Sequence, residues 1–229
     1  MQIPKHLIPF LGIALVDLVA RTLELSSITW VSKPLLMISL AYYFYRAVPS
    51  TALNRFVLAA LGFSCLGDTL LMFVSSNDAF FLIGLISFAL AHLIYIVINL
   101  NAVNEGKPGI KFQWQDIPFL LYGLGVFSLV KDGLGDMYFP ALSYTVLICI
   151  MGMTARKRWK KTDSQSFWLI MTGAGFFIIS DSLLAINRFL EPLPKADLLI
   201  MITYLLAQFL IVQGLVVFIK KIPLEAGSD

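Results

Sequence analysis

Residues 79–100 have the sequence AFFLIGLISFALAHLIYIVINL, a stretch that contains no Asp, Glu, Lys or Arg. A transmembrane α-helix needs about 20 mostly apolar residues to cross the hydrocarbon core of a bilayer. Backbone polar groups in hydrocarbon must be satisfied within the segment, so a helix is the expected element. The strict alternation of a membrane β-barrel strand is absent. This stretch therefore predicts an all-α, membrane-spanning fold.

The composition of the whole chain agrees with this prediction. Of its 229 residues, 59% are hydrophobic and 14% are charged, and its mean hydropathy is +0.83. Soluble domains are about 45–50% apolar and about 25% charged. A soluble core of this size cannot bury so much apolar surface. The net charge is +3, but the sequence does not interleave aromatic and basic residues in the way that proteins which stack nucleic-acid bases do. We therefore expect no nucleic-acid partner.

Seven further apolar stretches accompany the first, and all connections are short. The eight expected spans are residues 7–22, 32–47, 53–74, 79–100, 115–131, 136–155, 166–188 and 197–219. The spans at 7–22 and 115–131 are the weakest because they are short. A layout with seven crossings, in which 7–22 lies at the interface, is the alternative. We expect 7–22 to be a retained helix and not a signal peptide, and residues 1–229 to form a single transmembrane domain.

The basic residues predict the orientation of these spans. With eight crossings, twelve of the seventeen Lys and Arg fall on the side that holds both termini. They are Lys5, Arg46, Arg55, Lys107, Lys111, Arg156, Lys157, Arg158, Lys160, Lys161, Lys220 and Lys221. Loops rich in Lys and Arg stay in the cytoplasm, so both termini are predicted to be cytoplasmic, at the inner membrane if the protein is bacterial. The run 156–161 is a topology anchor or, alternatively, a site for anionic lipid.

The chain contains an apparent internal repeat. Residues 62–71 and 175–184 share the pattern Gly-Phe, four residues, Asp, Ser or Thr, Leu-Leu, and LAHLI at 90–94 resembles LAQFL at 206–210. Two matches in the same order indicate a four-plus-four duplication, with halves at about 7–100 and 115–219. Halves of four helices have the same orientation, and such parallel repeats place functional sites at their interface. Asp68 and Asp181 are therefore expected at one depth, facing a common cavity.

An ionisable residue within a span costs about 2.5–3.5 kcal/mol on insertion scales and usually serves a function. Two acids close together in a medium of low dielectric constant cannot both ionise cheaply, so one is expected to keep its proton. Such a pair suits general acid–base hydrolysis of an acid-labile bond. It equally suits proton or cation coupling in a transporter. A purely structural pairing is the third possibility, with Arg188 as a partner for Asp181.

Other polar residues surround the expected cavity. His92 forms a polar stripe with Tyr95 and Asn99, and Tyr204 and Gln208 form a second stripe. Each stripe is a candidate for substrate contact or for ordinary hydrogen bonding between helices.

Three further residues are predicted at the same membrane face as the acids. Lys33 precedes Pro34 at the expected first turn of the second helix, where a lysine snorkels to the interface or binds a phosphate. Asn187 is expected to cap the end of the seventh helix, and Asp17 is a further candidate for the cavity.

No metal or cofactor is expected. His, Cys and Glu do not occur at metal-ligand spacing, and no Gly-x-Ser-x-Gly nucleophile motif is present. His6 and His92 are the only histidines. Cys65 and Cys149 lie within apolar segments and behave as small hydrophobic residues. The paired carboxylates are the richest chemical group that remains.

Five segments together resemble the YhhN-like family of multi-pass membrane proteins, which includes the animal lysoplasmalogenases. They are KPL at 33–35, LGDTLL at 66–71, LAHLIY at 90–95, SDSLLAINRF at 180–189 and YLLAQ at 204–208. The resemblance implies hydrolysis of the vinyl ether of a lysoplasmalogen, a membrane lysophospholipid, with water as co-substrate. The products implied are a fatty aldehyde and glycerophospho-ethanolamine or glycerophospho-choline. Asp68 and Asp181 are the implied catalytic residues, and the implied substrate-binding residues are Lys33, His92, Asn187, Arg188, Tyr204 and Gln208.

The chemistry of the acid pair is compatible with this implication. A vinyl ether is hydrolysed by acid through an oxocarbenium ion, and paired carboxylates stabilise a similar cation in glycosidases. A small proton- or ion-coupled transporter, or a lipid-handling membrane protein, is the alternative function.

Overall fold

The computed structural model describes residues 4–103 and 112–221, and it is all-α over this part of the chain. The described residues form eight α-helices, which confirms the number expected from the apolar stretches. They are α1 (Ile8–Thr22), α2 (Ser26–Ala47), α3 (Ala52–Leu71), α4 (Ala79–Asn101), α5 (Ile117–Val130), α6 (Tyr138–Arg156), α7 (Ser164–Phe189) and α8 (Ala196–Lys221). Short 3₁₀ turns precede α1 and α5, and two more join α5 to α6.

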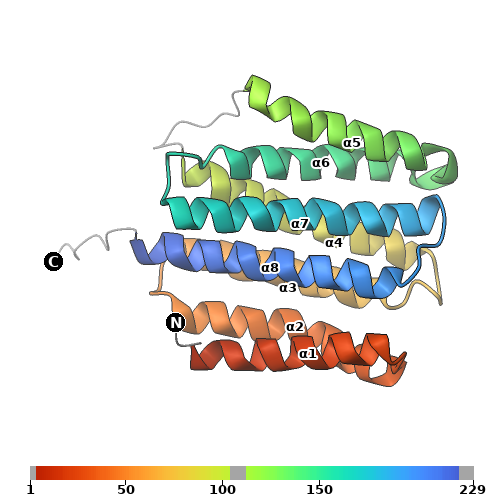
Figure 1. Ribbon diagram of the computed structural model, residues 1–229, viewed down its shortest axis with the longest axis horizontal. Helices are drawn as coiled ribbons and strands as arrows, with labels where there is room; N and C mark the ends of the chain where they lie inside the picture. The colour runs from red at the N-terminus through yellow and green to blue at the C-terminus, as the bar shows by residue number, and fades with distance from the viewer. Residues whose placement is uncertain (1–3, 104–111, 222–229) are drawn as a thin grey trace.

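The helices lie side by side with nearly parallel axes (Figure 1). The α3–α4 and α7–α8 hairpins occupy the centre and are the most extensively packed helix pairs. Helix α2 packs against α3 and α8, and α6 packs against α4 and α7, so that each closes one side of the central four. Helices α1 and α5 are outermost, on α2 and α6 respectively (Figure 1). Helix α1 begins and α8 ends at the same end of the bundle.

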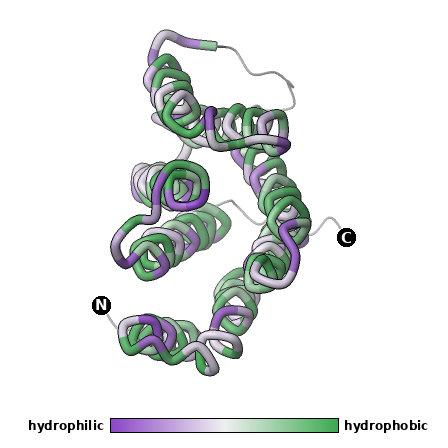
Figure 2. Tube along the Cα trace, turned by 90° about the vertical axis from the view of Figure 1, so that its right-hand side faces the viewer, coloured by the Kyte–Doolittle hydropathy of each residue, from purple (hydrophilic) through white to green (hydrophobic). Residues whose placement is uncertain are grey.

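The lengths of the helices follow the expected spans closely. Four of them, α4, α6 with its preceding turn, α7 and α8, are long and apolar enough to cross a membrane. Helices α1 and α5 have 15 and 14 residues. At about 1.5 Å per residue, these two are shorter than a hydrocarbon core of about 30 Å. Seen along the helix axes, the connections at the near end of the bundle carry hydrophilic residues, while the helices are largely hydrophobic (Figure 2).

Helix α2 differs from its prediction at the N-terminal end. It begins at Ser26, six residues before the expected start, so Pro34 lies inside the helix and not in its first turn. A proline leaves the carbonyl one turn earlier without its N–H donor, yet membrane helices tolerate proline where neighbouring groups satisfy the freed polar atoms. The freed carbonyl here is that of Trp30, and the thiol of Cys65 in α3 makes a separate contact, donating to the carbonyl of Pro34 itself at 3.5 Å. Lys33 is therefore carried by a continuous helix.

Small residues bring the central helices together. A Cβ atom added at Gly173 of α7 would lie 2.9 Å from the carbonyl oxygen of Ala207 in α8, and one added at Gly67 of α3 would lie 2.7 Å from the Phe88 ring in α4. Close approach at small residues is a common basis for helix association in membranes. The buried core lies between these helices and includes Leu61 and Phe177.

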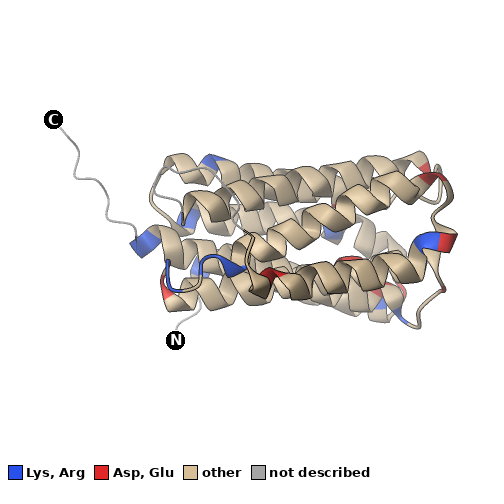
Figure 3. Ribbon diagram, turned by 90° about the horizontal axis from the view of Figure 1, so that it is seen from above, with Lys and Arg blue, Asp and Glu red and all other residues tan. Residues whose placement is uncertain are grey.

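Lys and Arg gather at the end of the bundle where α8 finishes (Figure 3). Within the run 156–161, Arg156 pairs with Asp116 at 2.7 Å. Arg158 is fully buried, with its guanidinium 4.5 Å from the centre of the Phe218 ring. These two arginines are therefore engaged within the protein and do not form part of a free basic surface. Lys107 and Lys111, counted toward the same side, lie outside the described residues.

Candidate functional site

A cavity of about 230 Å³ lies among α2, α3, α4, α7 and α8, toward the end of the bundle opposite the chain termini. Its walls combine apolar residues, such as Phe81 and Met201, with a concentration of polar ones. The polar and charged residues that line it are Lys33, Asp68, Ser180, Asp181, Asn187, Arg188, Asp197 and Tyr204. The two acids of the apparent repeat thus face one space, together with four of the six predicted substrate-binding residues.

Asp68 lies on α3 and is 3% exposed. Its Oδ2 accepts a hydrogen bond of 2.6 Å from the phenol of Tyr204 in α8. The ammonium of Lys33, from α2, lies 3.9 Å from Oδ1. Gly67 allows this placement, because its missing side chain lets the Phe88 ring of α4 approach α3 next to the acid. Asp68 therefore has both a neutral donor and a cation beside it.

Asp181 lies at the corresponding position on α7 and has different partners. Its Oδ2 accepts a 2.6 Å hydrogen bond from the phenol of Tyr144 in α6. Among the described residues, no Lys, Arg or His forms an ion pair with Asp181 within 4.0 Å. The two acids share one cavity but differ in the charge of their surroundings.

Gln208 is fully buried behind Asp68 and connects three helices. Its Oε1 accepts from the phenol of Tyr95 at 2.9 Å, and its Nε2 donates to Ser64 Oγ at 2.9 Å and to the Tyr204 oxygen at 3.4 Å. Gln208 does not line the cavity. The two polar stripes therefore do form hydrogen bonds between helices, which was one of the two roles considered for them. Gln208 also supports the Tyr204 phenol from behind.

His92 is also fully buried and lies outside the cavity lining. Its ring makes edge contacts with Tyr144 and Phe177, at centroid distances of 5.5 and 4.6 Å. Within residues 4–103 and 112–221, neither ring nitrogen has a well-aligned hydrogen-bond partner. The position of His92 makes it a neighbour of the tyrosine that holds Asp181.

The residues at the end of α7 lie at the cavity edge. The guanidinium of Arg188 pairs with Asp78, in the α3–α4 connection, at 2.6 Å, and not with Asp181 as the structural reading had it. The Asn187 side-chain oxygen accepts from the backbone N–H of Leu193 at 2.9 Å, which fastens the loop after α7.

Asp17 is not part of the cavity lining, which differs from the expectation. It is fully buried, and it accepts from Ser32 Oγ and from Arg21 Nε, both at 2.6 Å. Arg21 also pairs with Asp197, which does line the cavity. The carboxylate of Asp17 is therefore bonded to Arg21 of α1 and to Ser32 of α2. Its connection to the cavity lining runs through Arg21, which pairs with Asp197.

Tyr144 and Asp197 are the polar residues at this site that the sequence patterns missed. Tyr144 belongs to α6, where no polar stripe or repeat match drew attention to it, and Asp197 lies in the first turn of α8. A tyrosine within a long apolar helix, one crossing away from a buried acid, is the only sequence feature that could have indicated Tyr144. Among the residues that the structure describes, no three His, Cys, Asp or Glu side chains come together to hold a metal ion.

Comparison with known families gives a match over most of this architecture. A profile of the YhhN family matches residues 28–215, from α2 to near the end of α8. The chain belongs to the YhhN family. Together with the long apolar helices, this membership establishes a multi-pass integral membrane protein. No solved structure gives a significant match.

Relatives of this YhhN chain include proteins named lysoplasmalogenases. It is 30% identical to human lysoplasmalogenase TMEM86A over 158 residues, which cover 68% of the chain and 62% of the relative. It is 30% identical to human lysoplasmalogenase TMEM86B over 190 residues, or 82% of the chain and 75% of the relative. The pig TMEM86B is 32% identical over 153 residues. The chain thus matches less than two thirds of the length of TMEM86A.

Proposed function

We propose that this protein is a membrane-embedded hydrolase that cleaves the vinyl ether bond of lysoplasmalogens. The observation that carries the proposal is the pair of buried carboxylates, Asp68 and Asp181, on the lining of one cavity. Membership of the YhhN family and the lysoplasmalogenase relatives indicate the substrate class. The products are a fatty aldehyde and a glycerophospho-ethanolamine or glycerophospho-choline.

The reaction needs one proton donor and one anion. A carboxylic acid protonates the β-carbon of the vinyl ether, whose double-bond electrons form the new C–H bond, and leaves an oxocarbenium ion. Water adds to the cationic carbon and loses a proton to the carboxylate, which gives a hemiacetal. The hemiacetal collapses when its hydroxyl group returns a proton to the first carboxyl group, its C–O bond to glycerol breaks, and the glycerol oxygen takes the proton held by the second carboxyl group. One water is consumed, and both carboxyl groups return to their starting states.

The surroundings of the two acids suggest their roles. Asp68 has the Lys33 ammonium 3.9 Å away, which favours its carboxylate form. Asp181 has no such cation among the described residues, so it is the better candidate for the neutral acid. We therefore assign proton donation to Asp181, and stabilisation of the oxocarbenium ion and activation of water to Asp68.

The open end of the cavity provides groups for the phosphate of the substrate. Lys33 and Arg188 are the two cations on its lining, and Arg188 is held at the surface by Asp78. An arginine offers two parallel N–H donors to a phosphate, and a lysine offers a point charge. With the headgroup at this end, the reacting ether lies deeper, between the two acids.

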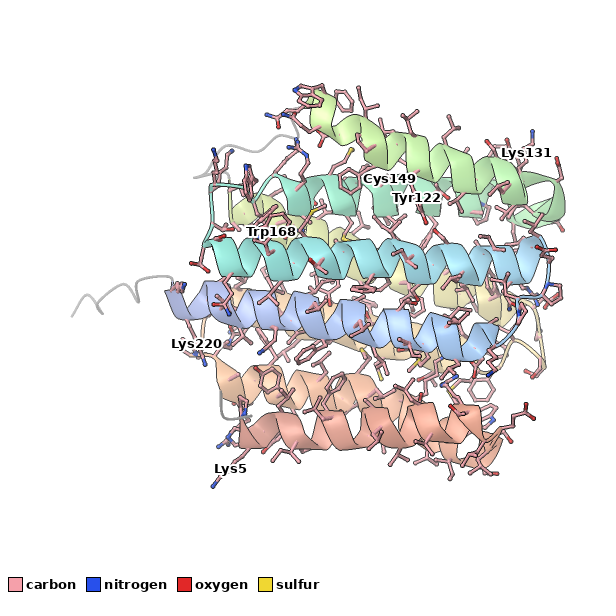
Figure 4. All side chains as sticks on the ribbon, viewed as in Figure 1. Lys5, Tyr122, Lys131, Cys149, Trp168 and Lys220 are labelled. Carbon is pink, nitrogen blue, oxygen red and sulfur yellow. The ribbon has the colours of Figure 1, made fainter. Side chains whose placement is uncertain are left out.

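The membrane topology belongs to the same proposal. We expect eight crossings, a four-plus-four repeat and cytoplasmic termini. The repeat is supported by the matching places of α2 and α6, which pack against α3 with α8 and against α7 with α4 respectively. Lys131 and Lys220 lie at opposite ends of the bundle (Figure 4). Cysteines substituted for them should react with an impermeant maleimide from opposite sides of the membrane, and labelling of both from one side would refute this topology.

A proton- or ion-coupled transporter is the second candidate function. It is favoured by the same pair of intramembrane acids at the interface of two similarly oriented hairpins, an arrangement typical of repeat transporters. Turnover in detergent, where no gradient exists, separates the two functions.

The experiment is aldehyde release by the purified protein in detergent, with a lysoplasmalogen and its saturated alkyl-ether analogue as substrates. We expect release from the vinyl ether alone, and a loss of at least a hundredfold in kcat in Asp68→Asn and in Asp181→Asn, within the range for general acid–base catalysis of about 10²–10⁴. Asp132→Asn, at an exposed position outside the cavity, is the matched control. Folded wild-type protein that releases no aldehyde would exclude the hydrolase and favour the transporter.

A further inference from the structure

A second pocket adjoins the cavity of the two acids. It has a volume of about 70 Å³ and lies among α4, α5, α6 and α7. The two spaces share five lining residues, which are Leu71, Phe81, Phe88, Asp181 and Leu184. Asp181 therefore stands at the junction, with the polar cavity on one side and this second pocket on the other.

Apart from Asp181, the polar groups on the lining of the second pocket are hydroxyls and one thiol, Cys149, which already have partners. Thr145 donates to the carbonyl of Ala141 at 2.8 Å, and Tyr122 donates to Ser182 Oγ at 3.1 Å. Tyr144 is engaged with Asp181. Asp181 is the only Asp, Glu, Lys or Arg on the lining. A charged or polar occupant would lose its hydration without gaining partners, so the pocket suits a hydrocarbon.

The pocket also reaches the outer surface of the bundle. Tyr122, on its wall, is 44% exposed on the outermost helix α5. Tyr122 and Cys149 lie in the space between α5 and α6 (Figure 4). Helix α5 approaches α6 closely at Gly123, where an added Cβ would lie 3.2 Å from the Thr145 methyl group. The lining of the pocket thus runs from Asp181 to a residue that is exposed on the outer face of the bundle.

We propose that this pocket binds the first carbons of the single aliphatic chain of the substrate. The inference rests on the proposed function and deepens it, since the chain in this pocket and the phosphate at Lys33 would place the ether beside Asp181. The rest of a long chain passes Tyr122 and continues among the lipid tails. The other space at the junction has charged groups among its apolar walls, so a second acyl chain on the glycerol would have to lie against Lys33, Asp68 and Arg188.

Substitutions that narrow the pocket provide the first test. Val126 of α5 lines it, whereas Leu124, on the same helix, is 62% exposed and does not. We expect Val126→Phe to raise KM about tenfold for a long-chain lysoplasmalogen and less than threefold for a propenyl analogue, whose three carbons do not fill the pocket. Leu124→Phe should leave both substrates unaffected. Equal loss for both substrates in Val126→Phe would contradict the chain site.

A binding measurement separates this inference from the proposed function. The probe is a saturated alkyl-ether lysophosphatidylcholine with a diazirine near the ether end of its chain, photolysed with the protein in lipid nanodiscs. We expect adducts on pocket residues such as Val126 and Cys149, which an unlabelled alkyl-ether lysolipid suppresses and a diacyl lipid does not.

The outcomes are distinct. Suppressible pocket adducts in a protein that hydrolyses no vinyl ether would keep the chain site and remove the proposed reaction. Hydrolysis together with adducts only at outward positions such as Leu124 would keep the reaction and overturn the chain site. Pocket adducts that a diacyl lipid suppresses equally well would also overturn it, because the pocket would then hold any bilayer chain.

Discussion

Tyr144 of α6 donates a 2.6 Å hydrogen bond to Asp181, and its ring lies against His92. Asp68 has the same 2.6 Å bond from Tyr204 of α8. When residues 90–94 of the first half are aligned with residues 206–210 of the second, Phe88 occupies the position that corresponds to Tyr204. A phenylalanine cannot donate, so the second acid takes its phenol from a different helix. The two acids are equivalent in the sequence pattern, but their hydroxyl partners are not.

These phenols are expected to position the carboxyl groups for reaction. We predict that Tyr144→Phe and Tyr204→Phe each lower kcat at least tenfold, or about 1.4 kcal/mol, with little change in KM. A hydrogen bond to a charged group contributes about 1.5–3 kcal/mol, which applies to Tyr204 beside the Asp68 carboxylate and to Tyr144 once Asp181 has given up its proton. The measurement is aldehyde release at saturating substrate. Tyr45→Phe, at a position 63% exposed on α2, is the control, and wild-type kcat in both cavity variants would show that the phenols only stabilise the fold.

Lys33 is expected to serve the phosphate of the substrate and the charge of Asp68. We predict that Lys33→Gln raises KM about tenfold for a lysoplasmalogen and less than threefold for an alkenylglycerol without phosphate. Lys33→Arg should recover much of the affinity because it retains the cation. Lys131→Gln, at the same end of the bundle but outside the cavity, should behave as wild type. An equal KM increase for both substrates would remove the phosphate role.

Gln208 is expected to contribute to stability more than to chemistry. Its removal in Gln208→Leu leaves the hydroxyls of Tyr95 and Ser64 without their buried partner. An unsatisfied buried polar group costs about 1–3 kcal/mol, although hydrogen bonds between membrane helices average only about 0.6 kcal/mol. We therefore predict a loss of about 1–2 kcal/mol in unfolding experiments in detergent. In the Gln208→Leu protein, Tyr95→Phe should lower the free energy of unfolding by less than it does in the wild type. If the losses of the two single substitutions simply add in the double variant, the two residues do not form a network.

The connection between α6 and α7 gives a prediction of pH dependence. The Asp163 side chain caps α7 by accepting from the N–H groups of Gln165 and Ser166, and it pairs with Lys221 at 2.6 Å. The hydrogen bond from Lys221, followed by that from Ser166, lowers the pKa of Asp163. A lowered pKa in the folded state stabilises the protein above the ordinary aspartate value of about 3.9, and this contribution disappears as the pH falls through the lower folded value.

Asp163→Ala should accordingly reduce the unfolding temperature at pH 7 and reduce it less at pH 3, below the ordinary pKa of aspartate. Lys221→Gln should show a smaller effect of the same sign, because the helix cap remains. An unfolding temperature that Asp163→Ala lowers equally at both pH values would mean that the carboxylate charge is not involved.

Several features of the fold follow from local sequence because the bilayer imposes a simple rule. Apolar stretches of sufficient length must form helices in lipid, so eight elements and most of their boundaries are readable from the sequence. The start of α2 is different. Ser26 to Ser32 are polar enough to suggest a connection, and only the packing of α1 against α2, with Ser32 bonded to Asp17, draws these residues into a helix.

The sequence by itself determined that the protein lies in a membrane and to which family it belongs. It also singled out Asp68 and Asp181, because an acid within a membrane span is costly and is therefore a candidate for a functional site. These properties depend on hydrophobicity, on spacing along single helices and on short motifs. Only the tertiary structure decided that Tyr144 holds Asp181, that Lys33 lies beside Asp68, that His92 and Gln208 lie behind the cavity, and that a second, largely apolar pocket includes Asp181 in its lining. Each of these depends on contacts between helices far apart in the chain, and the rotation of a helix about its axis is set by packing and not by its own sequence.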